Sequence, residues 1–219
     1  MRRGLFITLE GSDGSGKSTQ LKRIESFLSE KGYHTVVTRE PGGTVISEKI
    51  RELLLDKNHS EMDGRTEALL YAASRAQHVT EVIKPALERG DVVICDRFID
   101  SSIVYQGHGR KLGEQVEMIN QFAVAGYMPD ITFLFKINPE VGKSRIKTRN
   151  KDRLECEHME FYKEVFRGYT ELEKRYPDRI IGIDASRSIR EIHAEIRERL
   201  EVILCSRFHQ ISTGAFTKS

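Results

Sequence analysis

Residues 11–19 have the types and the spacing of a loop that binds phosphate. They read Gly-Ser-Asp-Gly-Ser-Gly-Lys-Ser-Thr and contain the complete pattern Gly-x-x-x-x-Gly-Lys-Ser/Thr. Glycines let a backbone curl closely around a polyanion, so that its N–H groups converge on phosphate oxygens. An apolar run precedes the loop and a helical pattern follows it, which distinguishes the motif from an ordinary turn. The loop therefore predicts binding of a nucleoside triphosphate.

The residues of the loop have separate expected tasks. Lys17 would reach the β- and γ-phosphates, and the Ser18 hydroxyl would ligate Mg²⁺. The helix that follows would direct its N-terminal dipole and its free amides at the phosphates. The predicted nucleotide-binding residues are Gly11, Ser12, Asp13, Gly14, Ser15, Gly16, Lys17, Ser18 and Thr19.

Charged side chains at the ends of two other predicted strands would meet the same crevice. Asp96 and Arg97 follow the apolar run 91–95, and Arg39 follows the β-branched run 34–38. A carboxylate such as Asp96 could orient Mg²⁺ or its water shell, and a guanidinium offers a planar fork for a second phosphate. A second anion site suits phosphoryl transfer to a monophosphate better than simple hydrolysis. The alternative for Asp96 and Arg97 is a local surface ion pair.

Tyr71 and Arg75 form a second pattern. They are spaced i, i+4 and would share one helix face. A ring with a guanidinium one turn away could stack on a nucleobase and hydrogen-bond its carbonyl. The spacing alone favours the simpler interpretation, a core tyrosine beside a solvated arginine.

The segment 143–153 is unusually basic. Arg145, Arg149 and Arg153 drift by about 40° per step on a helix and would share a face. An arginine face could close over a triphosphate and exclude water. A solvated basic helix is the alternative.

The elements that must position these residues alternate between strands and helices. The pattern predicts strands at 4–10, 34–38, 91–95, 131–137 and 179–183, and helices at 17–31, 44–56, 64–89, 100–106, 114–126, 139–149, 158–175 and 188–206. This order predicts a three-layer α/β fold, a five-stranded parallel sheet with helices on both faces and ligands beyond the carboxyl ends of the strands. We expect one domain over 1–206 with a short basic lid at about 143–156, and a tail at 207–219 without a clear pattern.

Composition sets weaker bounds. The chain has 219 residues, of which 38% are hydrophobic and 31% are charged, which suits a globular domain without a membrane span. Thr8 and Glu10 interrupt the first apolar stretch, so we expect no signal peptide. Cys95, Cys156 and Cys205 are scattered, as in reduced cytoplasmic proteins. The net charge of +2 is too small to indicate binding of nucleic acid.

Taken together, the motifs resemble thymidylate kinase of the bacterial type, within the P-loop nucleoside monophosphate kinases. The matching segments, in order, are 10–19, 39–44, 70–78, 96–98, 105–107 and 152–155. The resemblance runs from about residue 3 to residue 200. It implies transfer of the γ-phosphate of ATP to dTMP with Mg²⁺, giving dTDP and ADP. It also implies that the protein is a homodimer.

The resemblance also implies roles for charged residues. Arg97 and Arg39 would hold the dTMP phosphate, and Asp13 would lie near the acceptor 3′-OH and the metal. Lys17, Arg97 and Asp13 are then expected to be catalytic. Ser18 and Asp96 are the expected metal ligands.

For the nucleoside part of dTMP the resemblance implies a further set of contacts. Tyr71 would stack on thymine, and Arg75 would reach its O4 atom. Ser102 and Gln106 would lie near the base and the acceptor. Tyr105 would pack against the deoxyribose and exclude a 2′-OH.

Members of this family differ in the source of one catalytic arginine. Some carry it inside the phosphate loop, and others carry it in the lid. The variable loop positions 12–15 contain no cation here. We therefore expect the catalytic arginine to come from the lid, as Arg149 or Arg153.

Two other functions remain open from the sequence. One is a nucleotide kinase with another acceptor. The other is a P-loop switch or assembly protein, in which binding of the triphosphate changes the affinity for a partner. GTPases of that class usually need an Asn-Lys-x-Asp guanine reader after a strand, and residues 150–153 lack that spacing.

Overall fold

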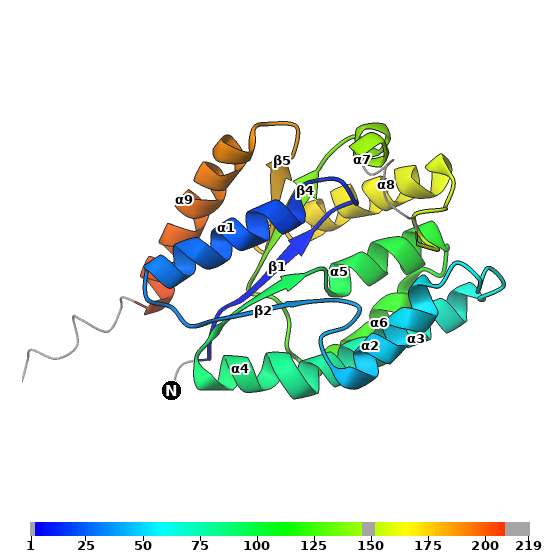
Figure 1. The fold of residues 1–219 in the computed structure, drawn as a ribbon, viewed down its shortest axis with the longest axis horizontal. Helices are drawn as coiled ribbons and strands as arrows, with labels where there is room; N and C mark the ends of the chain where they lie inside the picture. Colours follow the sequence, from blue (N-terminus) through cyan, green and yellow to red (C-terminus); the bar gives the residue numbers. More distant parts are fainter. Residues whose placement is uncertain (1–2, 146–151, 209–219) are drawn as a thin grey trace, which may run out of the picture.

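The computed structural model describes residues 3–145 and 152–208 of the chain. The strands in these residues form one parallel sheet in the order β2-β3-β1-β4-β5 (Figure 1). The strands are β1 (Phe6–Glu10), β2 (Thr35–Arg39), β3 (Val92–Asp96), β4 (Ile131–Lys136) and β5 (Ile180–Asp184). The predicted five-stranded parallel sheet is confirmed, with each strand within two residues of its expected bounds.

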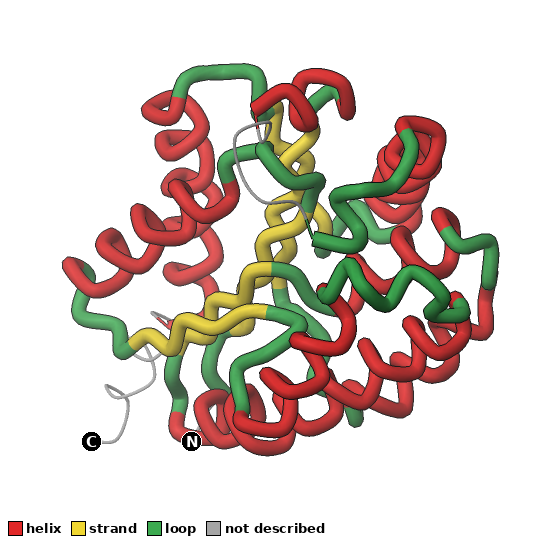
Figure 2. The backbone as a smooth tube through the Cα atoms, turned by 45° about the vertical axis from the view of Figure 1, so that its right-hand side comes forward, coloured by secondary structure: helices red, strands yellow, loops and turns green. Residues whose placement is uncertain are grey.

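Helices cover both faces of this sheet, as predicted (Figure 2). They are α1 (Lys17–Glu30), α2 (Val45–Leu55), α3 (Gly64–His78), α4 (Lys84–Arg89), α5 (Ile99–Ser102), α6 (Glu114–Val124), α7 (Pro139–Arg145), α8 (Met159–Arg175) and α9 (Ile189–Phe208). Alternate residues of a strand point to opposite faces. Ile7 and Leu9 therefore pack with residues of α1 and α9, whereas Phe6 packs with residues of α4 and α6.

Two predicted helices contain π-helical turns that the sequence pattern did not indicate. The expected helix 64–89 is interrupted by η1 (Val79–Ile83), and the expected helix 100–106 becomes α5 followed by η2 (Ile103–Gly109). At η1 the cause is Pro85, which has no backbone N–H to continue the α-helical ladder. The N–H of Lys84 instead bonds to the carbonyl of Val79, five residues back.

The last helix is longer than predicted. Helix α9 continues to Phe208, so Arg207 belongs to the domain and not to a tail. The Arg207 guanidinium donates to Asp130 at 2.8 Å and to the carbonyl of Gly4 at 3.0 Å. These contacts hold the end of α9 against the start of the sheet. Residues 209–219 of the expected tail lie outside the described residues.

Among the described helices, none combines the length and the apolar character that crossing a bilayer requires.

The parallel pairing brings the carboxyl ends of three strands to one edge of the sheet. Leu9 is paired with Asp96, and Asp96 is paired with Arg39. The residues that follow β1, β2 and β3 therefore begin side by side, although they are far apart in the chain. This edge carries the candidate site.

Candidate active site

The phosphate loop connects the central strand β1 to helix α1, as predicted. Gly11 and Gly14 have φ angles of 129° and 78°. A Cβ atom on either residue would lie 2.4 Å from a backbone oxygen, that of Phe135 for Gly11 and that of Gly142 for Gly14. Only glycine fits both the left-handed backbone and this close approach. The loop is thus seated between the end of β4 and helix α7.

The side chain of Lys17 is buried against the phosphate loop. Its ammonium donates to the carbonyls of Gly11 at 2.8 Å and Ser12 at 3.0 Å. Burial and the nearby Arg97 lower the pKa of Lys17 to about 8, although Asp13 and Asp96 oppose the shift. A phosphate next to this amine would favour its charged form.

Asp96 and the first turn of α1 offer oxygen ligands at the same edge. Asp96 Oδ1 is buried and finds no hydrogen-bond partner in residues 3–145 and 152–208. Ser18 and Thr19 begin α1 with exposed side chains. Mg²⁺ prefers such oxygens and usually needs only one or two carboxylates beside substrate phosphates. Ser18 and Asp96 therefore fit the ion.

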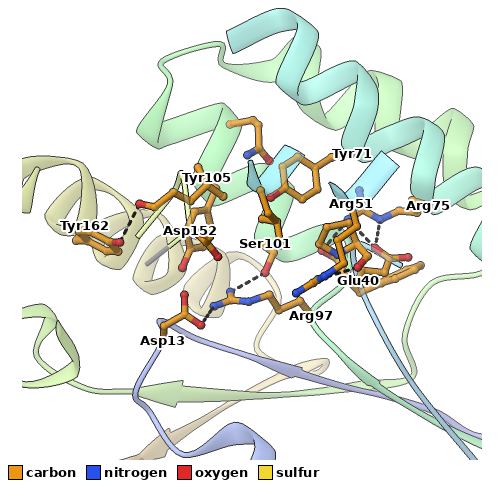
Figure 3. A pocket seen from close by; sticks show the side chains of 15 residues that line it. Asp13, Glu40, Arg51, Tyr71, Arg75, Arg97, Ser101, Tyr105, Asp152 and Tyr162 are labelled. Carbon is orange, nitrogen blue, oxygen red and sulfur yellow. Dashed lines mark hydrogen bonds and ion pairs between the residues drawn. The ribbon is translucent and has the colours of Figure 1, made fainter. Parts of the chain in front are cut away.

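A cavity opens beside the phosphate loop, at the carboxyl ends of β1, β2 and β3 (Figure 3). It encloses about 680 Å³, including space open to solvent, which is within the range of small-molecule sites. Its lining includes five of the predicted acceptor-site residues with one charged end and one aromatic end: Asp13, Arg97, Tyr71, Arg75 and Tyr105. Gln106 lines the cavity as well. The structure thus brings together residues from the phosphate loop, β3, α3 and η2.

Arg97 lies at the charged end of the cavity. Its guanidinium donates to Asp13 at 3.0 Å and to the Ser101 hydroxyl at 3.1 Å, and it lies over the Tyr105 ring at 5.2 Å. The φ angle of Arg97 is 67°, a left-handed backbone that costs a non-glycine residue on the order of 1 kcal/mol. This turn directs the side chain back over the phosphate loop (Figure 3).

Glu10, which the sequence pattern did not single out, supports that turn. It is buried at the end of β1 and accepts hydrogen bonds from the N–H of Phe98 at 2.8 Å, the Ser101 hydroxyl at 2.6 Å and the Tyr169 hydroxyl at 2.8 Å. Burial, and next the charge of Asp100, raise the pKa of Glu10. The signal that could have identified Glu10 in the sequence is a charged residue at the end of an apolar strand.

Arg39 is not brought into the cavity. Its guanidinium bonds to Glu48 at 3.0 Å and to the carbonyl of Pro41 at 3.0 Å, and its side chain is 46% exposed. Arg51 of α2 lines the cavity instead and also donates to Pro41, at 2.9 Å. The prediction that Arg39 projects into the crevice is therefore wrong for this structure. Glu48, on the next helix, redirects it.

Arg75 is buried and donates four hydrogen bonds within the described residues. It donates to Glu40 at 2.8 Å, to the Ser102 hydroxyl at 3.0 Å and to the carbonyl of Phe98 at 3.0 Å, and it also bonds to Asn120. The simpler expectation of a solvated arginine is wrong. Arg75 lines the cavity as a rigid donor.

The remaining residues of the aromatic end differ in how they meet the cavity. Tyr71 lines it, and burial raises the pKa of its hydroxyl. Tyr105 also lines it, and burial raises its pKa to about 12. Ser102 does not line it, because its hydroxyl is buried against Arg75; its neighbour Ser101 lines the cavity instead. Residue 101, one position earlier on the same helix, faces the opposite way.

The predicted arginine face of the lid does not extend to Arg153. Helix α7 includes Arg145, which donates to the carbonyl of Gly14 in the phosphate loop at 3.3 Å. Arg153 instead lies in a turn, 8% exposed, with Nε bonded to the carbonyl of Leu54 at 2.9 Å and its guanidinium paired with Glu67 at 2.7 Å. The prediction that Arg153 shares a helix face with Arg145 is therefore wrong.

Arg149 lies outside the described residues, so its expected position over the triphosphate stays a prediction. Three described residues beyond it contribute to the cavity. Asp152, Leu154 and Tyr162 line its wall, and the Tyr162 hydroxyl donates to the carbonyl of Leu154 at 3.0 Å. The described end of the expected lid and the start of α8 are thus part of the cavity wall.

Comparisons with known proteins point to one family. The family model described as thymidylate kinase matches residues 9–196. A thymidylate kinase of Exiguobacterium sp. is 53% identical over 195 residues, which are 88% of this chain and 92% of the relative. One from Clostridium novyi is 50% identical over 201 residues, 90% of this chain and 98% of the relative. A crystal structure of thymidylate kinase from Ehrlichia chaffeensis has a TM-score of 0.74 at 35% identity, covering 90% of this chain and 99% of that one.

Proposed function

The chain belongs to the thymidylate kinase family and is a nucleoside monophosphate kinase that forms dTDP from dTMP and ATP, and we propose that the cavity beside its phosphate loop holds dTMP. One observation carries the assignment of the site. The cavity is lined by Asp13 of the phosphate loop and by Arg97 at one end, and by Tyr71 and Arg75 at the other. A monophosphate bound there has its phosphate beside the donor nucleotide and its base among aromatic side chains.

The phosphoryl group passes between two phosphates that the protein holds in line, so catalysis rests on positioning and on neutralising charge. Lys17 neutralises the β- and γ-phosphates of ATP. Arg97 holds the dTMP phosphate, joined by Arg51, which lines the same cavity. Asp13 bonds to Arg97 at 3.0 Å and aligns its fork.

The Ser18 hydroxyl and Asp96 would hold Mg²⁺, which would supply positive charge for the transferring group. The buried Asp96 oxygen without a partner among the described residues supports this assignment. Charge from the lid comes from Arg145, which already reaches the phosphate loop, and from Arg149. We assign Arg153 a structural role, because its guanidinium is bound to Glu67.

At the aromatic end, Tyr71 stacks on thymine and Arg75 donates to its O4 atom. Arg75 is buried, and its bonds to Glu40 and Ser102 fix the plane of its guanidinium. Tyr105 packs on the deoxyribose. Its ring lines the cavity and is held in place by burial, so a 2′-OH at that place would meet a filled space.

The acceptor assignment is tested by measuring ADP formation with ATP and Mg²⁺ and a panel of monophosphates. We expect turnover to depend on the acceptor and kcat/KM for dTMP to exceed that for dCMP and dGMP by about 10²-fold or more. Equal rates with dGMP or dAMP would favour another nucleotide kinase. ADP formation at the same rate without any acceptor would favour a P-loop switch protein.

We also propose a homodimer formed through α2, α3 and α6. These helices lie next to one another (Figure 1). The large apolar side chains that they expose to solvent are Val45, Ile46 and Leu53 of α2, Leu69 of α3, and Met118 and Phe122 of α6. Exposed apolar side chains gathered on neighbouring helices are characteristic of a protein interface. A second copy of the chain would cover them.

Phe122, which is 88% exposed, provides the test of the dimer. We expect Phe122→Asp to convert the protein to a monomer, because a carboxylate would be buried without a partner in the interface. Light scattering coupled to size-exclusion chromatography measures the mass. Val202→Asp on α9, a residue 66% exposed on the opposite side of the sheet, is the matched control and should remain dimeric. A monomeric wild type, or a dimeric Phe122→Asp variant, contradicts the proposal.

We place the reaction in the cytoplasm, where ATP is available and thiols stay reduced. The thiols of Cys95, Cys156 and Cys205 are all free.

A further inference from the structure

Glu67 connects the aromatic end of the cavity to the described end of the expected lid at 143–156. It lies in the first turn of α3 with no exposed surface. Its carboxylate accepts hydrogen bonds from Gln106 Nε2 at 2.8 Å and from Arg110 at 3.0 Å and 3.3 Å, and it pairs with Arg153 at 2.7 Å. Three side chains from distant parts of the chain thus converge on one buried carboxylate.

The charges around Glu67 keep it ionised. Burial alone would raise the pKa of Glu67, but the hydrogen bonds and the charge of Arg110 outweigh burial, and the pKa is lowered. Arg153 adds a second positive charge beside Glu67. Glu157 adds a second negative charge to the cluster, because it forms a 2.6 Å ion pair with Arg110. An ionised carboxylate can only accept hydrogen bonds.

This acceptor decides which way the Gln106 amide faces. An amide has a donating NH₂ group at one end and an accepting oxygen at the other. Because the carboxylate of Glu67 repels the amide oxygen, Nε2 must face Glu67. The other end, Oε1, receives no hydrogen bond from any described residue, and Gln106 lines the cavity. An acceptor is therefore presented beside the donor Arg75.

We propose that Glu67 is a positioning residue for base specificity, which holds the Gln106 amide so that its oxygen meets the ring N–H of the base. This inference rests on the proposed dTMP site. Thymine and uracil carry an N–H at N3 next to a carbonyl at C4, which matches the acceptor of Gln106 and the donor of Arg75. Cytosine carries a lone pair at N3 and an amino group at C4, so both contacts would be repulsive.

The test is Glu67→Gln, which keeps the size of the side chain and removes the charge. The new amide can accept from or donate to Gln106, so the Gln106 amide becomes free to turn. We expect the ratio of kcat/KM for dTMP to that for dCMP to fall by about tenfold or more, chiefly through KM. An unchanged ratio in an active variant overturns the proposal.

Two further variants separate this role from a general effect on the fold. Glu157→Gln removes the other anion of the same cluster without touching Gln106 and should leave the ratio unchanged. In a Gln106→Leu background, Glu67→Gln should no longer alter the ratio, because the amide through which it acts is gone. A full additional loss in that background would show that Glu67 acts by another route and would contradict the proposal.

The wild-type protein gives an independent measurement if Glu67→Gln does not fold. Methylation of dTMP at N3 removes the donor that the Gln106 oxygen is proposed to accept. Affinity for 3-methyl-dTMP should be at least about tenfold weaker than for dTMP, and equal affinity overturns the proposal. Failure of the proposed function would look different, because the wild type itself would then bind no dTMP.

Discussion

Replacement of Arg97 by alanine is expected to lower kcat/KM for dTMP by about 10³-fold or more, with ATP binding close to that of the wild type. Arg97 bonds to Asp13 and Ser101 and directs its fork to the charged end of the acceptor cavity. A loss of that size corresponds to about 4 kcal/mol of transition-state stabilisation. Alanine keeps a similar backbone strain, since it is also an L residue in the left-handed region.

Steady-state kinetics and calorimetric titration with dTMP and with a non-hydrolysable ATP analogue measure both quantities. Arg97→Lys keeps the charge but loses the planar fork and should recover only part of the activity. Arg65→Ala is the matched control, since Arg65 is exposed and forms an ion pair with Asp63, and neither residue lines the cavity. Equal affinity of the wild type and Arg97→Ala for dTMP would remove Arg97 from the role given to it here.

Replacement of Lys17 by methionine is expected to reduce kcat by about 10³-fold, because the charge on the transferring phosphate then loses the cation of the phosphate loop. Methionine fills a similar space, so the loop should keep its shape. The backbone of Gly11 and Gly14 holds that shape, although the variant loses the hydrogen bonds of the Lys17 ammonium to the carbonyls of Gly11 and Ser12. Single-turnover kinetics would isolate the chemical step. A kcat within tenfold of the wild type would contradict the assignment.

Lys17 also predicts a dependence on pH. Its pKa of about 8 in the protein without nucleotide means that the amine is charged below pH 8 and loses its proton above it. The value of kcat/KM for ATP should therefore fall as the pH rises through about 8. At saturating ATP, kcat should fall at higher pH, because bound phosphates favour the charged amine. A Lys17→Arg variant stays charged and should lack the step; an identical step in that variant would assign it to another group.

Local sequence was sufficient for the phosphate loop. Its nine residues are consecutive, and the glycines at 11 and 14 require a particular backbone wherever they occur between a strand and a helix. The parallel sheet was equally predictable, because its strands are short apolar runs that alternate with helical patterns. Of the site residues predicted from motifs, Asp13, Arg97, Tyr71, Tyr105 and Gln106 do line one cavity.

The residues that the sequence placed wrongly have long or polar side chains, each of which could bond to more than one partner. Arg39 could have entered the crevice, but Glu48 on the next helix captures it, and Arg51 occupies the cavity wall. Ser102 was placed at the base, but Arg75 takes its hydroxyl. In each case the competing partner belongs to another element, and no spacing in the chain shows which partner is nearer.

The buried ionic contacts show the same limit most clearly. Glu67 and Arg153 are far apart in the chain and meet only because α3 packs beside the turn that contains Arg153. Periodicity placed Arg153 on a helix face over the triphosphate, whereas the buried carboxylate of Glu67, which must be paired, holds it beside α3.

The chemistry of this protein could be predicted from its sequence. The phosphate loop, the charged residues at the ends of strands and the aromatic residue on a helix each depend on a few neighbouring residues. The tertiary structure alone decided which charged groups face the substrates and which hold the walls. Burial makes an unpaired charge costly, so each guanidinium and carboxylate takes the partner that the packed elements bring within reach. Glu67 and Arg153 illustrate that choice, and Arg97 with Asp13 illustrates the case in which sequence and packing agree.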